Sequence, residues 1–427
     1  MNTSYYLLLS IAYVSLTAQN EKGPLPSVDY LVSGFRANRD SFPTLHILWT
    51  RKHELADASL KLWEIQAEKY GKESNDASKT ARERAMALQL YENAKKFLAN
   101  PILRKPSIII QEFRTDRKSY QYRRFNASDL SDLPIGYSFS KRSPADSLNL
   151  QTIFANTRIS AYDHATATYK FWFGRRDGRD YYRGEIRRSR LGDSEAFIPP
   201  LGLDSDAHGG ILNEIDTFFA LPKAQMSVIR AETKGGVETY VIEHLQELKL
   251  APDFLIKELP RELIARFPGK LQLFAITTAW VDAKRGCIPL RVEKTGAFFY
   301  EGRRLGPVPQ LANSLTVFKV QKVDRGGWYP MKGRVYSYNQ DPEWTKGQNS
   351  MELLLTDRFY DIPHVIVNST SWDTQNIETV SDIADFFRLD FPNDTEYFDE
   401  QSKKFLFIGD QETYREKVLR HENPQHR

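Results

Sequence analysis

The chain is predicted to be an α+β protein built around a large curved antiparallel sheet, an open or half β-barrel, with covering helices and an inserted helical hairpin. Two observations predict the sheet: a hairpin unit that occurs twice, and a series of β-rich runs separated by short turns rich in Asp and Gly. A third observation, a long stretch with helical periodicity between two such runs, predicts the inserted hairpin.

The repeated unit turns at glycine and returns through proline, an apolar residue and a basic residue. It occupies residues 286–291 (GCIPLR) and 327–332 (GWYPMK), and the copies follow β-rich runs at 271–281 and 315–323. The short turns between run and return are typical of antiparallel hairpins, which need no crossover helix. Proline so close to a turn fits the first residue of a strand or a bulge, and the basic residue that follows it should face outward.

The N-terminal part is expected to contribute one helix and one strand before the inserted hairpin. Residues 28–39 predict a short helix and residues 44–51 predict a strand. Residues 54–99 carry apolar side chains at helical spacing, the segment 71–78 (GKESNDAS) breaks the pattern, and an Asn-Pro pair ends it. This predicts two antiparallel helices, which pack on the sheet, project as a spacer or serve as a partner-binding arm.

The strand signal returns after these helices and continues towards the C-terminus. Because most of the runs flank Asp/Gly turns, they should pair as sequential antiparallel hairpins. Further strands are predicted at 107–113, 120–125, 169–173, 181–187, 227–232, 237–244, 364–370 and 404–408, short helices at 212–221 and 377–387, and an irregular insertion at 248–270.

Length and the N-terminal segment set the expected domain boundaries. A chain of 427 residues that is 41% hydrophobic can bury one large core or two. The apolar run 5–16 is too short to span a bilayer and suits a signal peptide cleaved near Ala18, with a buried N-terminal strand as the alternative. Export to the periplasm or cell envelope is therefore expected. The expected parts are a signal peptide at 1–19, an open-barrel domain at 20–340 with the helical hairpin at 54–99, a C-terminal α+β extension of the same domain at 341–413, and a frayed tail at 414–427.

The charge balance and the missing motifs argue against several functions. Lys+Arg 59 against Asp+Glu 55 leaves a net charge of +4, which provides no long-range field for nucleic acid. No glycine-rich phosphate loop opens a helix, and no Gly-x-Ser-x-Gly elbow is present. We therefore expect no catalytic residues and no cofactor. An enzyme with a site assembled from distant residues, such as His208, Asp204 and Glu214, is a weaker alternative.

The metal-binding patterns in the sequence are incomplete. Residues 204–209 (DSDAHG) imitate the first half of a calcium loop, but Ile215 stands where the bidentate carboxylate is needed. His421 and His426 do not have the spacing of a zinc-binding helix, and Pro424 would interrupt such a helix. No metal site is expected.

Three residues that often carry chemistry are expected to be structural. Cys287 stands at the start of a strand beside an isoleucine, which favours a small buried apolar side chain over a reactive thiolate. His46 and His364 lie in apolar strand patterns, so both are expected to be hydrogen-bonded core histidines.

An arginine-rich hairpin is a candidate for anion binding. Residues 175–190 hold seven arginines with two tyrosines among them, and Phe-Trp-Phe precedes the segment. In an exported protein the available anions are lipid headgroups and wall polymers. A charged hairpin edge that blocks edge-to-edge pairing explains the same residues. The candidate anion contacts are Arg175, Arg176, Arg179, Arg183 and Arg187.

The hairpin series resembles the later strands of the periplasmic lipoprotein-carrier (LolA-like) superfamily. The resemblance is carried by residues 279–282 (AWVD), 289–293 (PLRVE) and 327–330 (GWYP). It covers residues 226–338 well and 107–187 loosely, and large exported bacterial proteins of unknown function share the pattern. It implies an incomplete antiparallel barrel around an apolar cavity, with helices as a lid, that binds acyl chains.

A curved sheet that does not close leaves a concave apolar face, which side chains, helices or a ligand must fill. The leading interpretation is an exported, non-enzymatic protein that binds a lipid or lipoprotein on this face and does not span the membrane. The alternative is a structural or interaction protein of the envelope with a filled barrel. The candidate apolar lining is Phe274, Trp280, Phe298, Phe318 and Trp328.

Overall fold

The structure, a computed structural model, describes most of one large sheet and the helices around it. The helices with described bounds are α2 (Val28–Asp40), α3 (Asp57–Ser74), α4 (Ala81–Ala99) and the short 3-10 helix η5 (Lys223–Gln225). The described residues are 24–42, 44–100, 105–116, 120–127, 158–163, 168–175, 181–187, 215, 218–219, 221–234, 236–248, 271–300, 303–304, 310–324, 326–341, 363–379, 391 and 395–409.

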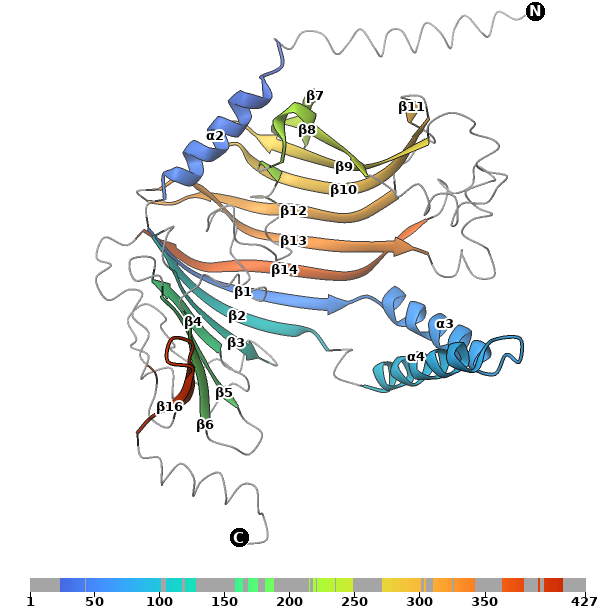
Figure 1. The fold of residues 1–427 in the computed structure, drawn as a ribbon. Helices are drawn as coiled ribbons and strands as arrows, with labels where there is room; N and C mark the ends of the chain where they lie inside the picture. Colours follow the sequence, from blue (N-terminus) through green and yellow to red (C-terminus); the bar gives the residue numbers. More distant parts are fainter. Residues whose placement is uncertain are drawn as a thin grey trace, which may run out of the picture.

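A single 16-stranded sheet runs through these residues (Figure 1). Its order is β16-β15-β6-β5-β4-β3-β2-β1-β14-β13-β12-β10-β9-β8-β7, and β11 pairs with β10 beside this path. Among the described strands no pairing joins β7 to β16, so the curved sheet stays open, as predicted. The strands are β1 (Leu45–Leu55), β2 (Ser107–Thr115), β3 (Tyr120–Ala127), β4 (Arg158–Asp163), β5 (Thr168–Arg175), β6 (Tyr181–Arg187), β7 (Met226–Lys234), β8 (Val237–Leu248), β9 (Leu271–Asp282), β10 (Ile288–Tyr300), β11 (Arg303–Arg304), β12 (Gln310–Lys322), β13 (Trp328–Gln340), β14 (His364–Glu378), β15 (Thr395–Asp399) and β16 (Lys404–Ile408).

Neighbouring strands pair antiparallel with one exception, which corrects the sequence prediction. β15 runs parallel to β6, so that Thr395 lies opposite Tyr182 and Asp399 lies opposite Ile186. The interpretation of the β5–β6 hairpin as a charged edge was therefore wrong, because β6 has a paired strand on both sides. A parallel pair needs a long connection, and here more than two hundred residues separate the two strands in sequence, so no local turn could signal it.

Three predicted boundaries were also wrong. β1 continues through Leu55, so the helical hairpin begins at Asp57 rather than at Glu54. α3 continues through the predicted break to Ser74, where the Asn75 side chain donates to the Gly71 carbonyl at 2.8 Å and helps to end the helix. β14 extends to Glu378, so the start of the predicted helix at 377–387 is strand, and residues 380–387 lie outside the described ranges.

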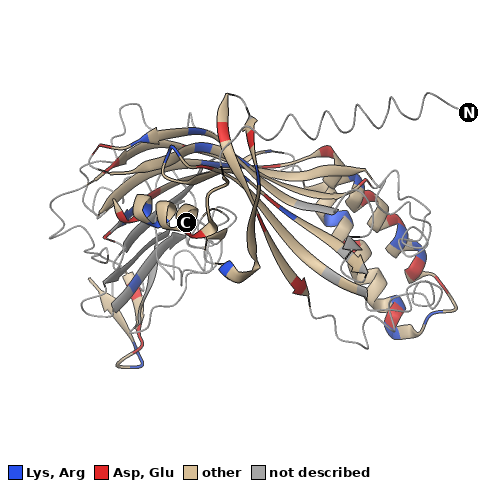
Figure 2. Ribbon diagram, turned by 90° about the horizontal axis from the view of Figure 1, so that it is seen from above, with Lys and Arg blue, Asp and Glu red and all other residues tan. Residues whose placement is uncertain are grey.

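The helical hairpin α3–α4 projects from the end of β1 (Figure 1). Thr80 and Glu83 form a capping box at the start of α4, and Trp63 stacks on Phe97 with ring centroids 4.5 Å apart. Residues of both charge signs are spread along the two helices (Figure 2). The arrangement is that of a self-packed spacer attached at its base to the sheet, where the Ala56 N–H donates to the Val367 carbonyl at 3.0 Å.

One face of the sheet is covered by α2, and we name it the helix face. Figure 2 shows the sheet arched, with α2 on the inner side of the arch. Phe35 of α2 lies in one core cluster with Trp49, Trp372 and Tyr329 of the sheet, and each of these side chains is at most 2% exposed. Burial of such large aromatic side chains is the main stabilising contribution here. The inner face near α2 is thus filled with protein side chains.

The turns of both repeated hairpins meet at Asn38, near the end of α2. The Asn38 amide donates to the Trp328 carbonyl at 2.9 Å, and its Oδ1 accepts from the Trp328 N–H at 2.7 Å. A Cβ added to Gly286 or to Gly327 would collide with the Asn38 side chain. Gly286 also has φ +69, a conformation that favours glycine. Both turning glycines are therefore needed for α2 to sit against the sheet.

Candidate functional site

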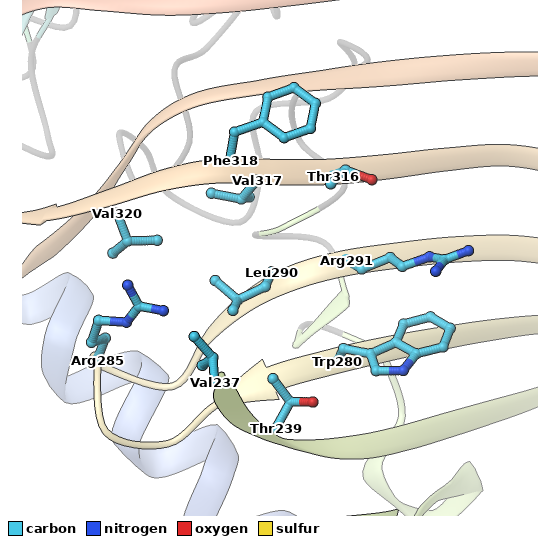
Figure 3. Close-up of a pocket in the computed structure, with 10 residues that line it drawn as sticks. All are labelled: Val237, Thr239, Trp280, Arg285, Leu290, Arg291, Thr316, Val317, Phe318 and Val320. Carbon is cyan, nitrogen blue, oxygen red and sulfur yellow. The ribbon is translucent and has the colours of Figure 1, made fainter. Parts of the chain in front are cut away.

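A pocket of about 380 Å³ opens on the face of the sheet opposite α2, which we name the pocket face (Figure 3). In this view α2 lies behind the strands and the pocket side chains lie in front. The volume falls within the range of small-molecule sites. The pocket is lined by Val237, Thr239, Trp280, Arg285, Leu290, Arg291, Thr316, Val317, Phe318 and Val320, from β8, β9, β10, β12 and the β9–β10 turn.

Two bulges in neighbouring strands create the apolar middle of the pocket. The β9–β10 register shifts between Pro289 and Arg291, and the β12–β13 register shifts between Val317 and Lys319. The extra residues are Leu290 and Phe318. A bulge turns a side chain away from its regular alternation, which is why bulges often lie beside binding sites. Phe318 is 57% exposed and lines the cavity, so a ligand in the cavity would cover its ring.

Trp280 and Arg291 form one end of the pocket. The Trp280 indole N–H donates to Glu232 Oε1 at 2.6 Å, which fixes the ring plane. The Arg291 guanidinium lies 4.9 Å from the centre of the indole ring and also pairs with Glu293. Such cation–π stacking leaves a flat, partly apolar wall with the charge of Arg291 already compensated.

Arg285 forms the other end of the pocket (Figure 3). Its side chain is held by Asp282, a carboxylate that is 0% exposed. Asp282 Oδ1 accepts from the backbone N–H groups of Lys284 and Arg285 at 3.0 and 3.2 Å, and Oδ2 accepts from Arg285 Nε. The Asp282 carboxylate therefore both stabilises the turn and positions the Arg285 guanidinium.

The arrangement can hold a molecule with an apolar body. Leu290, Phe318 and Val320 offer aliphatic and aromatic contact between the two arginine-bearing ends. Trp280 supplies a ring face of the kind that dominates binding energies. Six of the ten described lining residues are apolar or aromatic, which suits contact with an apolar molecule.

The five residues predicted to line an apolar face are not gathered on one face. Trp280 and Phe318 line the pocket. Phe274 lies further along β9, on the same face as Trp280 by strand alternation, with its ring centroid 4.7 Å from that of Phe299. Trp328 packs partly buried against the core of the helix face. Phe298 lies in β10 opposite Leu273, and its side chain is outside the described part of the structure.

The arginine-rich hairpin is described only in its backbone. In backbone register, Arg175 lies opposite Tyr181, Arg183 opposite Phe173, and Arg187 opposite Tyr169. Arg176 and Arg179 lie outside the described residues, as do Asp204, His208, Glu214, His421 and His426. Ile215, the residue that spoils the calcium pattern, is fully buried.

His46 is the hydrogen-bonded buried histidine that the sequence predicts. Its Nε2 lies 2.8 Å from Glu112 Oε1, and its Nδ1 lies 2.7 Å from Glu378 Oε1. Arg114 also donates to Glu112, at 2.9 Å. The ring is 3% exposed, so the cluster ties β2, β1 and β14 together around a buried imidazole, and it reaches solvent only through Glu378 and Arg114. His364, the other predicted core histidine, is only half-buried at the start of β14.

Cys287 is a buried apolar side chain, as predicted. It is 3% exposed, and its Sγ fills the space beside Gly34 of α2, where a Cβ would collide with it. Burial raises the pKa of the thiol to about 11, and the nearby charge of Asp282 adds to this. The thiol is therefore protonated and unreactive at neutral pH.

The residues that the structure describes contain neither a metal cluster nor a membrane-spanning helix. Within them, no group of three or more His, Cys, Asp or Glu side chains could hold a metal ion. In the same part of the chain, no helix is both long and apolar enough to cross a bilayer.

Comparison with known proteins finds similarity in the fold alone. No family model matches the chain, and no curated protein matches it. The structure is similar to one described as an outer membrane lipoprotein-sorting protein domain from Vibrio parahaemolyticus, with 9% identity and a TM-score of 0.32 over 83% of this chain and 94% of the other. It is also similar to a DUF1329 family protein from Desulfovibrio piger, with 10% identity and a TM-score of 0.33 over 85% of this chain and 98% of the other. At this level of similarity, function has to be argued from the residues of this chain.

Proposed function

We propose that the protein is an exported, non-enzymatic binding protein that holds an apolar or acyl-bearing ligand, a lipid or the lipid part of a lipoprotein, in the pocket between β8 and β12. The observation that carries the proposal is the pair of bulges that turn Leu290 and Phe318 into one cavity beside the Trp280 ring. Exposed apolar side chains around a cavity are expected where a ligand completes the packing. The binding position differs from the concave face expected from the sequence, because side chains fill the inner face near α2.

Phe318 offers a clean test because it is largely exposed. Phe318→Ala should change the free energy of unfolding by less than about 0.5 kcal/mol, as exposed substitutions usually do. Native mass spectrometry of protein purified from its own envelope should show an acyl-bearing molecule bound to the wild type and lost from this variant.

Phe405→Ala is the matched control, since Phe405 is 72% exposed on β16 and does not line the pocket. It should retain the ligand. A wild-type protein that carries no such molecule, or equal retention by both variants, would contradict the proposal.

A second candidate function is an interaction protein of the envelope that uses the helical hairpin as its contact surface. The specific observation is that α4 exposes Met86 and Leu88, at 62% and 47%, on a hairpin that projects from the sheet. Two results together would favour this function over ligand binding. The wild-type protein would show a ligand-free mass, and a Met86→Lys variant would lose a binding partner that the wild type retains.

A further inference from the structure

We infer that Arg285 binds the acidic head of the ligand, so that the pocket selects acyl chains that end in a carboxylate or phosphate over neutral ones. This inference rests on the proposed function and adds a ligand class to it. Its basis is the way in which Asp282 holds the guanidinium.

The guanidinium of Arg285 is fixed through a single nitrogen. Arg285 donates from Nε to Asp282, and in the described part of the chain neither of its terminal nitrogens has a hydrogen-bond partner. A guanidinium has five N–H donors, so the four on the terminal nitrogens remain for a ligand. Two parallel N–H groups match the two oxygens of a carboxylate or phosphate.

The turn prepares this group before any ligand arrives. Asp282 is buried, and its other oxygen is occupied by two backbone N–H groups of the turn, so the carboxylate cannot swing into the pocket. The Arg285 side chain is 30% exposed, and it lies at one end of the pocket beside Val320 and Leu290 (Figure 3). A positioned guanidinium loses little side-chain entropy on binding, which favours affinity.

The second arginine of the pocket serves a different purpose. Both arginines are ion-paired, but Arg291 donates to Glu293 from a terminal nitrogen and lies against Trp280, whereas Arg285 donates to Asp282 from Nε. The pocket therefore has one end suited to an anion and one suited to an apolar chain, with Leu290 and Phe318 between them.

Calorimetry with a matched set of ten-carbon probes tests the inference. Decanoate, decyl phosphate and decanol share the chain and differ in the head, and each is used below its micelle concentration with the full chain. Decanoate and decyl phosphate should bind about tenfold more tightly than decanol, as expected for one charge-assisted bidentate contact. The ratio between the two anions shows which head the site prefers.

Variants of the turn test whether anion binding needs the guanidinium of Arg285 or only a positive charge. Arg285→Gln should lower the affinity for decanoate to that for decanol and leave the affinity for decanol unchanged. Arg285→Lys should bind decanoate with an affinity between those of the wild type and Arg285→Gln, because it keeps the charge but lacks the two parallel N–H groups. Lys284→Gln is the control, since Lys284 is the exposed neighbour whose side chain is 82% accessible. It should leave all three affinities unchanged.

The failures of the two proposals are distinguishable. Equal affinities of the wild type for decanoate and decanol would overturn the role of Arg285 and leave the apolar pocket standing. The comparison among wild-type affinities does not depend on how well any variant folds. Lack of binding by all three probes would overturn both this inference and the proposed function.

Discussion

The two copies of the hairpin unit, β9–β10 and β12–β13, hold α2 in the same way but carry different chemistry. In both copies the turning glycine packs against Asn38, and in both a register shift follows the proline, which leaves Leu290 in one copy and Met331 in the other as the bulged residue. The shared residues are those that the fold requires.

Leu290 and Arg291 of the pocket stand at positions that the copies share, whereas Trp280 and Arg285 stand at positions where the copies differ. Asp282 and Arg285 of the first copy correspond to Val323 and Gly326 in the second, and Trp280 corresponds to Gln321. In the second copy Val323 is buried in the core, and a Cβ on Gly326 would collide with the Phe42 ring. The second turn thus packs on the core where the first turn presents an arginine. Comparison of the copies thus shows that the docking of α2 is common to both turns, whereas a turn arginine held by a buried aspartate is found in the first copy only.

The largest effects are expected from the shared glycines. Gly286→Ala should lower the free energy of unfolding by about 3 kcal/mol, because it combines a positive φ with a collision against the buried Asn38 side chain. Gly327→Ala should be comparably destabilising, since its Cβ would also lie 2.8 Å from the Asn38 carbonyl oxygen. Urea unfolding measures both changes.

Gly236→Ala is the matched control for these variants. Gly236 has φ +77 in the β7–β8 turn, but a Cβ there would meet nothing within 4 Å. Gly236→Ala should lower the free energy of unfolding by about 1 kcal/mol, which is the cost of the backbone strain alone. Equal costs at Gly236 and Gly286 would show that docking on α2 does not constrain the repeated turns.

A smaller effect is expected at Cys287, which stands where the second copy has Trp328. Burial raises the thiol pKa from 9.0 to about 11, so above pH 9 the unfolded chain releases this proton while the folded chain retains it. Stability contributed by this group is complete below pH 9 and is lost as the pH rises towards 11, by about 1 kcal/mol at pH 10.

Cys287→Ala should lower the free energy of unfolding at both pH 8 and pH 10. The loss of stability between pH 8 and pH 10, measured by urea unfolding, should be smaller in this variant than in the wild type by the contribution of the thiol. An unchanged difference between pH 8 and pH 10 in the variant would show that the thiol does not titrate between these limits.

The sequence predicted the local part of this architecture well and the non-local part poorly. Glycine turns, the prolines beside them and the burial of Cys287 could be read from the chain because short segments determine them. The pairing of β15 with β6 could not, because its partners are far apart in sequence and share no turn. β4 and β15 were missed as strands because short runs carry little periodic signal.

The candidate site was predicted in part. Trp280 and Phe318, which were predicted to line an apolar face, share a cavity, and their contact with a ligand stays a prediction. Their face could not be predicted, since the bulge at Phe318 reverses the alternation of β12 and nothing local marks it. Arg285 was missed because its role depends on Asp282, three residues earlier, folding back over the turn. An Asp followed three residues later by Arg at a hairpin turn is the signal that could have found it.

The most direct test of ligand binding on the pocket face is a crystal structure of the protein with 10-bromodecanoate, in which the anomalous signal of bromine locates the chain. The bromine is expected among Trp280, Leu290 and Phe318, with the alkyl chain leading to Arg285. A bromine site on the helix face beside α2, or an empty pocket in a crystal that contains the compound, would contradict the account.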